Sequence, residues 1–332
     1  MESKFSDVDE YGFQRSEDFD YKKYEEIMSE YLKVLTKRQM QWEKYMRSNH
    51  DFAVINRALK RYIRKGIPGH LRSIVWMKTS GATAAKAAAP HLYQNLLKET
   101  HDDEIVDIIK IDLPRTFPNN IFFPDIQNQL FNILVAYAHY NKDVGYCQGL
   151  NYIAGLLLIV TKDEEGTFWL LKHIVEHIAS DYHTKTMRGL ITDIGVLNEM
   201  LKTRVPEVHA HCKLLGLPWA VIVTKWFICL FAEVLPTETV LRIWDCLFSE
   251  GYKILFRVSV TLIVRHRDSL MATGDISQLA NIFRDMIHSS MVTNCHEFMN
   301  SIFTIPGNIR RRDIESLRTR VTVEKDVADA IC

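Results

Sequence analysis

Apolar residues recur at three- and four-residue steps along most of the chain, the spacing that gathers them on one face of an α-helix. In residues 20–47 the step is carried by Tyr24, Ile27, Tyr31 and Leu35. A similar period in residues 54–65 stops at Gly66, a residue type typical of the position after a helix end. Further helices are predicted over 91–99, 103–112, 125–141, 149–160, 166–179, 190–204, 207–215, 219–233, 238–248, 252–270, 276–289, 294–303 and 311–319.

The pattern contains no convincing period-two alternation with hairpin turns, and it predicts an all-α protein of many short helices. Residues 1–19 are polar and acidic and are expected to be loose, while residues 81–90 are low in complexity and read as an insert or a loose helix. We expect a charged, partly helical extension over 1–50, a helical domain over 51–305, and a C-terminal helix and tail over 306–332.

Composition narrows the class of protein without naming a chemistry. The chain has 332 residues, 47% hydrophobic and 25% charged, which suffices for a sizeable core. Lys+Arg and Asp+Glu both number 41, so no net charge favours nucleic acid or an anionic membrane. The six cysteines form no CxxC pair and are expected to be reduced thiols in the cytoplasm. The N-terminal residues have no apolar core, so no secretory signal is expected. The longest apolar run, 150–160, is interrupted at Asn151 and far short of the ~20 residues that span a bilayer.

The stretch "IDLPRTFPNN" places Arg115 between Pro114 and Pro118. Each proline fixes its own φ and disfavours the helical region for the residue before it, so Arg115 is expected in a stiff segment outside a helix interior. Ile105, Ile108, Ile109 and Asp112 fall at helical steps, so the packing face of the helix before Arg115 is expected to end near Asp112. Asp112 lies three positions before Arg115, close enough for an ion pair that would orient the guanidinium. An ordinary loop arginine with a surface salt bridge would have the same sequence pattern.

The stretch "VGYCQGLNYIAGLLLIV" places Gln148 in a glycine-flanked bend directly before an apolar helix. Gly145 and Gly149 permit unusual φ or a close backbone approach there. The alternative is a glutamine that caps the helix or satisfies a neighbouring carbonyl.

Together these stretches resemble the paired signature of the TBC domain family, GTPase-activating proteins for Rab-type small GTPases. The pattern IxxDxxR corresponds to Ile109, Asp112 and Arg115, and YxQ corresponds to Tyr146 and Gln148. The resemblance covers about residues 66–255 and continues to about 305 by helical period. Its other marks, in chain order, are Gly66, Pro68, Arg72, Trp76, Trp226, Phe231, Pro236, Trp244, Asp245 and Gly251.

The resemblance implies a two-lobed helical domain that supplies Arg115 and Gln148 in trans to a GTP-bound Rab GTPase and so regulates membrane traffic. Arg115 would reach the phosphates, Gln148 would orient the attacking water, and Asp112 would hold Arg115. Tyr146 and Gly149 belong to the same supporting set. GTP and Mg²⁺ would be carried by the partner, with no cofactor or metal of the chain's own. The protein would be cytoplasmic and recruited to endomembranes through the GTPase.

Other readings stay open on the residues. A non-catalytic helical module could bind a GTPase or an adaptor through the same surface. "HIVEH", residues 173–177, matches the HxxEH pattern of zinc proteases, although a five-residue match arises easily by chance. "HAH", residues 209–211, would point its two rings to opposite sides of a helix. The basic face Arg57, Lys60, Arg61, Arg64 and Lys65 could contact phosphate or anionic lipid, or be solvated and paired.

Overall fold

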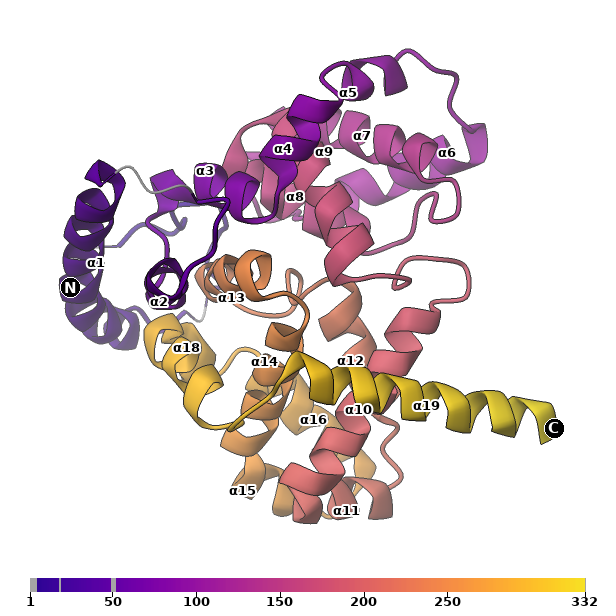
Figure 1. Cartoon of the computed structure of the whole chain (residues 1–332). Coiled ribbons are helices and arrows are strands. Elements are labelled where there is room, and N and C mark those ends of the chain that lie inside the picture. Colours follow the sequence, from indigo (N-terminus) through magenta and orange to yellow (C-terminus); the bar gives the residue numbers. More distant parts are fainter. Residues whose placement is uncertain (1–4, 18, 49–51, 332) are drawn as a thin grey trace. The chain divides into compact units, whose positions relative to one another are not determined.

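Helices make up the regular structure of this computed structural model, which describes residues 5–17, 19–48 and 52–331 (Figure 1). Those residues contain no strand, and their only β-type pairing is two isolated bridges near the N-terminal end. The all-α prediction is therefore confirmed. The chain forms two compact units, the first up to Ile174 and the second from Val175.

The first unit is built on three helices that pack against one another: α7 (Phe123–Tyr140), α8 (Leu150–Thr161) and α9 (Glu164–His173). Helix α8 carries the longest apolar run, and nine of its twelve residues are buried. The remaining elements of the unit are α1 (Tyr21–Arg47), α2 (Arg57–Lys65), α3 (Gly69–Thr79), α4 (Ala82–Ala88), α5 (Leu92–Leu96), α6 (Asp103–Asp112) and the 3₁₀ turn η1 (Leu113–Arg115).

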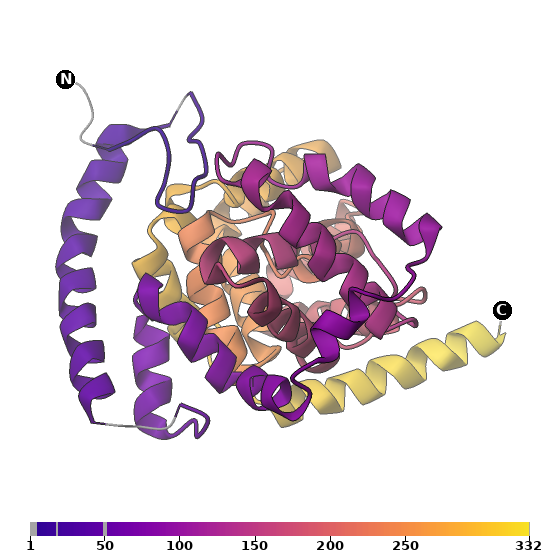
Figure 2. The same cartoon turned by 90° about the horizontal axis from the view of Figure 1, so that it is seen from above.

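Helix α1 lies beside α2, as Figure 2 shows. The indole of Trp42 donates to the carbonyl of Gly66 at 2.8 Å, and the rings of Tyr45 and Tyr62 are 4.9 Å apart. Gly66 ends α2 with φ +108, as its sequence position predicted. The predicted loose helix over 81–90 is the regular helix α4, which packs against α3 and α9.

The prediction that residues 1–19 are loose is wrong for the described residues 5–17, while residues 1–4 and 18 lie outside the described chain. Residues 7–15 form a small hairpin, with a bridge between Val8 and Gln14. The Asp9 carboxylate accepts from the backbone amides of Tyr11 and Phe13, both at 2.9 Å. A short acidic sequence can thus fold locally when its own side chain satisfies the turn amides.

The second unit gathers around α13 (Thr237–Glu250) and α14 (Lys253–Arg265), which pack against each other and against α18 (Cys295–Thr304). A π-helical turn, η2 (Ile174–Ile178), spans the boundary at which this unit begins. The remaining helices are α10 (Arg188–Arg204), α11 (Pro206–Leu214), α12 (Trp219–Ile228), α15 (Arg267–Met271), α16 (Ile276–Met286), α17 (Ser290–Thr293) and α19 (Arg311–Ile331).

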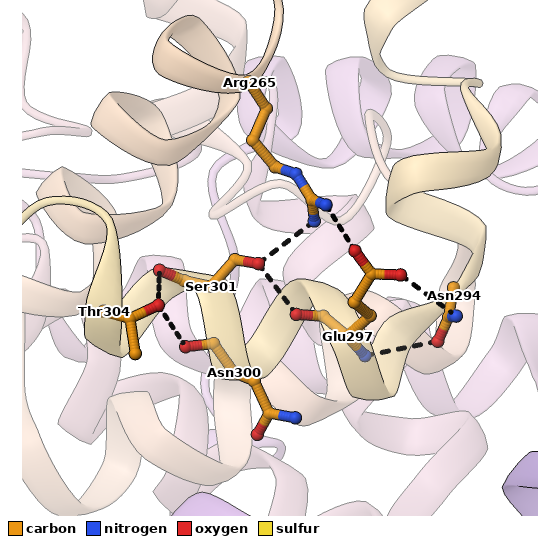
Figure 3. Close-up of polar contacts among 6 residues, drawn as sticks. All are labelled: Arg265, Asn294, Glu297, Asn300, Ser301 and Thr304. Carbon is orange, nitrogen blue, oxygen red and sulfur yellow. Dashed lines mark hydrogen bonds and ion pairs between the residues drawn. The ribbon is translucent and has the colours of Figure 1, made fainter.

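Arg265, at the end of α14, fastens that helix to α18 (Figure 3). Its guanidinium donates to the Ser301 hydroxyl at 3.0 Å and pairs with the Glu297 carboxylate. Asn294 caps the same end of α18 by accepting from the Glu297 amide at 3.2 Å. One arginine therefore joins two helices that are 30 residues apart in sequence.

Helix α19 packs along α10 through a buried charge cluster. Asp193 of α10 is 1% exposed and accepts two hydrogen bonds from Arg318, each 2.7 Å, and one from the Tyr182 hydroxyl at 2.6 Å. Arg318 also stacks 3.9 Å from the ring centroid of Tyr252. Arg318 thus contacts Asp193 through one edge of its guanidinium and Tyr252 through one face.

Two predicted helices end earlier than expected, for local reasons. The helix predicted over 219–233 stops at Ile228, because Leu230 and Phe231 take positive φ and the Phe231 amide bonds back to the Trp226 carbonyl at 2.8 Å. The helix predicted over 252–270 breaks at His266, whose backbone leaves helical geometry. Among the described residues, none of the helices combines the length and the apolar character that a membrane crossing requires.

Candidate functional site

The candidate site is built at the C-terminal end of α6. Asp102 caps the start of that helix by accepting from the Glu104 amide at 2.9 Å, and Asp103 and Glu104 place negative charge in its first turn. Asp112 is the last residue of α6, and η1 continues from it to Arg115. The helix therefore delivers a carboxylate and a guanidinium one turn apart.

Asp112 and Arg115 form an ion pair with opposite exposures of its two members. The Asp112 side chain is 6% exposed, whereas that of Arg115 is 62% exposed. A single amino group of Arg115 contacts Asp112 Oδ1. Asp112 therefore orients the Arg115 guanidinium through one amino group, while most of the side chain is exposed to solvent.

The second oxygen of Asp112 accepts a hydrogen bond from the Tyr146 hydroxyl at 2.7 Å. Burial, followed by this bond to Asp112, raises the pKa of the Tyr146 phenol above its ordinary value, so the phenol remains a donor. One buried carboxylate therefore ties the end of α6 to the loop 141–149, which bears Gln148.

A second bridge joins the same two segments. The Thr116 hydroxyl donates to the Asp112 carbonyl at 2.8 Å and accepts from the Asn151 amide group at 2.7 Å. The Asn151 carbonyl oxygen in turn accepts from the backbone amide of Gly149 at 3.0 Å. Thr116 and Gly149, which neighbour Arg115 and Gln148 in sequence, are thus joined through both ends of one buried amide.

Gln148 itself is exposed, in the turn directly before α8. Gly145 and Gly149 on either side of this turn have φ of +55 and +114, so the glycines are required by the backbone. Gln148 does not cap α8, and its amide makes no hydrogen bond within the described part of the chain. The alternative reading of a capping glutamine is therefore wrong.

Pro118 acts on the residue before it as predicted, whereas Pro114 does not. Leu113, before Pro114, has φ −53 and ψ −53, so Pro114 occupies the first turn of η1 and the residue before it is helical. Arg115 lies in this 3₁₀ turn, not in an extended segment. Before Pro118, Phe117 is outside the right-handed helical region, with φ +50, and its ring is buried.

Two isoleucines extend an apolar stripe from Arg115 along α6. Ile108 is 49% exposed and Ile111 is 60% exposed. The steps from 108 to 111 and from 111 to 115 place all three side chains on one face. The expectation that Ile108 packs inward was wrong, whereas Ile109 and Asp112 are buried as predicted.

The other signature residues lie in the interiors of their units. Arg72 and Trp76 of α3 are 1% and 0% exposed. In the second unit the Trp244 indole donates to the Leu230 carbonyl at 2.9 Å, and Asp245 pairs with Arg242 at 3.8 Å, both carboxylate and guanidinium being buried. Trp226 is buried, Pro236 precedes α13, and Gly251 ends it with φ +74. Within its own unit, each of these residues supports the fold.

No group of three or more His, Cys, Asp or Glu side chains that could hold a metal ion occurs among the described residues. The rings of "HAH" diverge as predicted, His209 to Asn198 at 3.0 Å and His211 to Thr273 at 3.1 Å. The zinc reading of "HIVEH" consequently lacks a ligand set in the described chain.

Sequence reasoning missed Thr116, Asn151 and the hairpin 7–15. Asn151 did leave a signal, because it is the polar residue that interrupts the apolar run 150–160. A buried asparagine needs partners for both ends of its amide, which is the role that Thr116 and Gly149 fill.

Comparison with known proteins agrees with the motifs. Residues 69–271 match the model of the Rab-GTPase-TBC domain family, and the broader boundaries 51–305 stay a prediction. Growth hormone-regulated TBC protein 1-A of Danio rerio is 46% identical over 316 residues, 94% of this chain and 88% of that protein. Growth hormone-regulated TBC protein 1 of Homo sapiens is 43% identical over 321 residues, 95% of each.

Solved structures give the same result. The crystal structure of the Chlamydomonas flagellar RabGAP TBC domain has a TM-score of 0.77 at 32% identity, covering 91% of this chain and 100% of that chain. The Ypt/Rab-GAP domain of Gyp1p has a TM-score of 0.70 at 19% identity, covering 82% and 98%, and this likeness bears on the fold alone.

Proposed function

The chain belongs to the Rab-GTPase-TBC domain family, and from this premise we propose that it accelerates GTP hydrolysis on a Rab-family GTPase by lending it Arg115 and Gln148. One observation carries the proposal. Buried Asp112 holds both the arginine and the Tyr146 loop, while Arg115 and Gln148 themselves stay exposed. Side chains that are exposed, in segments that a buried residue holds in place, can be inserted into the active site of another protein.

The chemistry explains why both groups are needed. When water attacks the γ-phosphorus of GTP, the bond to the bridging oxygen breaks and negative charge grows on that oxygen. The guanidinium of Arg115 would neutralise this charge, and such an arginine is worth ~10³–10⁵ in rate, or roughly 4–7 kcal/mol of barrier. The Gln148 amide would accept a hydrogen bond from the attacking water and donate one to the phosphate.

Support from Asp112 makes this insertion efficient. A free arginine side chain loses rotamer entropy when it enters a site, and a fixed partner reduces that loss in advance. The contact through one amino group leaves the other N–H donors of the guanidinium for phosphate oxygens. Thr116 and Asn151 limit motion of the backbone on either side of the pair.

The apolar stripe of Ile108 and Ile111 would dock the GTPase. Both isoleucines are exposed in the free protein, and a patch of exposed apolar side chains is a candidate surface for a partner to cover. Their position on the face of Arg115 means that a partner seated on them would present its nucleotide to the arginine. GTP and Mg²⁺ would belong to that partner, and recruitment to endomembranes would follow from the GTPase.

The test is single-turnover GTP hydrolysis over a panel of GTP-loaded Rab GTPases. Wild type should accelerate at least one member, Arg115→Ala should lower that acceleration by about 10³-fold or more, and Gln148→Ala by about 10²-fold. Arg284→Ala and Gln94→Ala remove an exposed arginine and glutamine from α16 and α5, and should behave as wild type.

Two outcomes would contradict the proposal. If both finger variants accelerate hydrolysis as well as wild type, the mechanism is wrong. If wild type binds GTP-loaded members of the panel and accelerates none, the chain is a non-catalytic interaction module.

A further inference from the structure

The hairpin of residues 7–15 lies against the loop that follows Arg115. This loop, residues 116–122, is called the finger loop below. The Gln14 amide donates to the Asn119 carbonyl and the Ile121 amide donates to the Gly12 carbonyl, both at 2.9 Å. The Asn120 side chain also donates to the Tyr11 carbonyl at 2.9 Å. Three hydrogen bonds therefore join segments about 109 residues apart in the chain.

Aromatic contacts continue the attachment. The Phe13 ring meets the Phe117 ring edge to face, with centroids 5.1 Å apart. Phe117, in turn, contacts Tyr152 of α8 at 5.4 Å and Phe123 of α7 at 5.9 Å. Phe117 is the residue with φ +50 two positions after Arg115, so Phe13 packs on the strained turn of the finger loop.

The hairpin is also anchored away from the finger loop. The Tyr11 hydroxyl accepts a hydrogen bond from the buried guanidinium of Arg72 at 2.6 Å. The Arg15 guanidinium lies 4.3 Å from the ring centroid of Tyr24 at the start of α1 and 4.7 Å from that of Phe19. A segment held at its turn and at its C-terminal end can restrain what it touches.

Gly12 makes the fit sensitive to one atom. It has φ +90, and an added Cβ would lie 2.4 Å from a ring carbon of Phe122. Gly81, at the start of α4, has a similar φ of +82 but nothing within 4 Å of an added Cβ. Alanine would be strained at either position by the positive φ, but only at position 12 would its Cβ also clash with a neighbour.

From these contacts we propose that the hairpin 7–15 is a positioning element of the arginine finger, held outside the family-matched residues 69–271. Asp112 and Asn151 fix the finger loop where it leaves Arg115, and the hairpin fixes the remainder through Asn119, Asn120 and Ile121. The proposal rests on the proposed function of Arg115. Tyr11 and Phe13 act through the loop and do not touch the nucleotide.

The experiment compares full-length Gly12→Ala, Phe13→Ala and Phe13→Leu with Gly81→Ala. Hydrolysis by an accelerated Rab GTPase gives kcat and KM, and hydrogen exchange gives the protection of the Ile121 amide. Gly12→Ala and Phe13→Ala should lower kcat by about ten- to a hundred-fold, the scale of a misplacement near 1 Å, and leave KM within a factor of about three. The Ile121 amide should lose protection, Phe13→Leu should recover part of the rate, and Gly81→Ala should match wild type.

The outcomes separate this proposal from the function on which it rests. If Arg115→Ala abolishes acceleration but Gly12→Ala and Phe13→Ala keep the wild-type kcat, the hairpin proposal is overturned and the proposed function stands. Unchanged protection of the Ile121 amide in both variants overturns it too, whatever the hydrolysis assay gives. A variant that does not fold is recognised by its circular dichroism, and Phe13→Leu, the mildest change, then decides.

Discussion

Each of the two units contains a buried aspartate that is bonded by an arginine and a tyrosine, and the two clusters differ in how exposed the arginine is. In the first unit a buried aspartate, Asp112, accepts from an arginine and a tyrosine; in the second, Asp193 does the same with Arg318 and Tyr182. Arg318 donates two hydrogen bonds to its aspartate and stacks on the ring of Tyr252, and its side chain is 30% exposed. Arg115 donates one hydrogen bond to its aspartate, and its side chain is 62% exposed.

The difference suggests what would distinguish an arginine that acts on a partner, as proposed for Arg115, from a structural one. Burial of the carboxylate and the presence of a tyrosine donor are common to both clusters. What differs is how much of the guanidinium stays exposed, 62% of the side chain at Arg115 and 30% at Arg318. Donors of an exposed guanidinium can be hydrated by water, so leaving them without a protein partner does not destabilise the fold. The same donors can bind phosphate oxygens.

The largest expected effect separates the two arginines by geometry. Arg115→Lys should lose most of the ~10³–10⁵-fold acceleration, because an ammonium cannot present the planar fork. Its free energy of unfolding should change by less than about 0.5 kcal/mol, since the site is at the surface. Single-turnover hydrolysis and urea unfolding measure the two quantities, and a lysine variant with wild-type rate would remove the distinction drawn above.

The next effect falls on stability. Arg318→Ala should destabilise the chain by about 3–5 kcal/mol, because it leaves Asp193 charged and buried with one donor. Arg320→Ala, two residues along α19, removes an exposed arginine paired with Glu199 at 3.3 Å and should cost about 0–1 kcal/mol.

Thermal and urea unfolding of both variants measure this, with GTP hydrolysis assayed well below the transition. The hydrolysis rate of Arg318→Ala should equal that of wild type there. A stable Arg318→Ala variant, or one that is folded but inactive, would show that the two clusters do not divide structure from function as argued.

Acid should weaken the second cluster through His183, the neighbour of Tyr182. Burial lowers the pKa of His183 from 6.5 to about 4, with its Nε2 2.9 Å from the Ile228 carbonyl. Between these values the unfolded chain binds a proton that the folded chain does not, so stability falls as pH drops from 6.5 to 4. The loss approaches about 3 kcal/mol. His183→Gln should flatten that part of the urea-unfolding profile, and an unaltered pH slope would exclude His183 as its cause.

The sequence predicts these two clusters unequally, for a physical reason. Asp112 and Arg115 are three residues apart on one helix end, so the pair is visible in a local motif. Asp193 and Arg318 are 125 positions apart, and the helical period of α19 says nothing about which of its arginines meets a carboxylate. The helices themselves were predictable because their apolar faces repeat locally.

Local reasoning failed where a long-range contact or a turn decides. The acidic hairpin 7–15 has its own turn bonds, but its place against residues 119–121 rests on contacts that no local pattern contains. Leu113 is helical although a proline follows it. Pro114 lies in the first turn of η1, a position that proline tolerates because its missing N–H is not needed there. Ile108 looked like a core residue because period alone cannot separate a packing face from an exposed apolar one.

The smallest effect compares the two tyrosines, which differ by a single hydroxyl from phenylalanine. Tyr182→Phe should cost about 1–3 kcal/mol of stability, because the buried Asp193 oxygen then loses one of its two donors where water cannot replace it. Tyr146→Phe should cost less than that, because Tyr146 is half-buried whereas Tyr182 is fully buried, so water can take the place of its hydroxyl more easily. It should also lower the hydrolysis rate by about tenfold, as Asp112 loses the bond that orients it. Urea unfolding and single-turnover hydrolysis on both variants give four numbers. If Tyr182→Phe slows hydrolysis as much as Tyr146→Phe does, the tyrosine bonds serve general rigidity and the orientation of Arg115 does not depend on Tyr146.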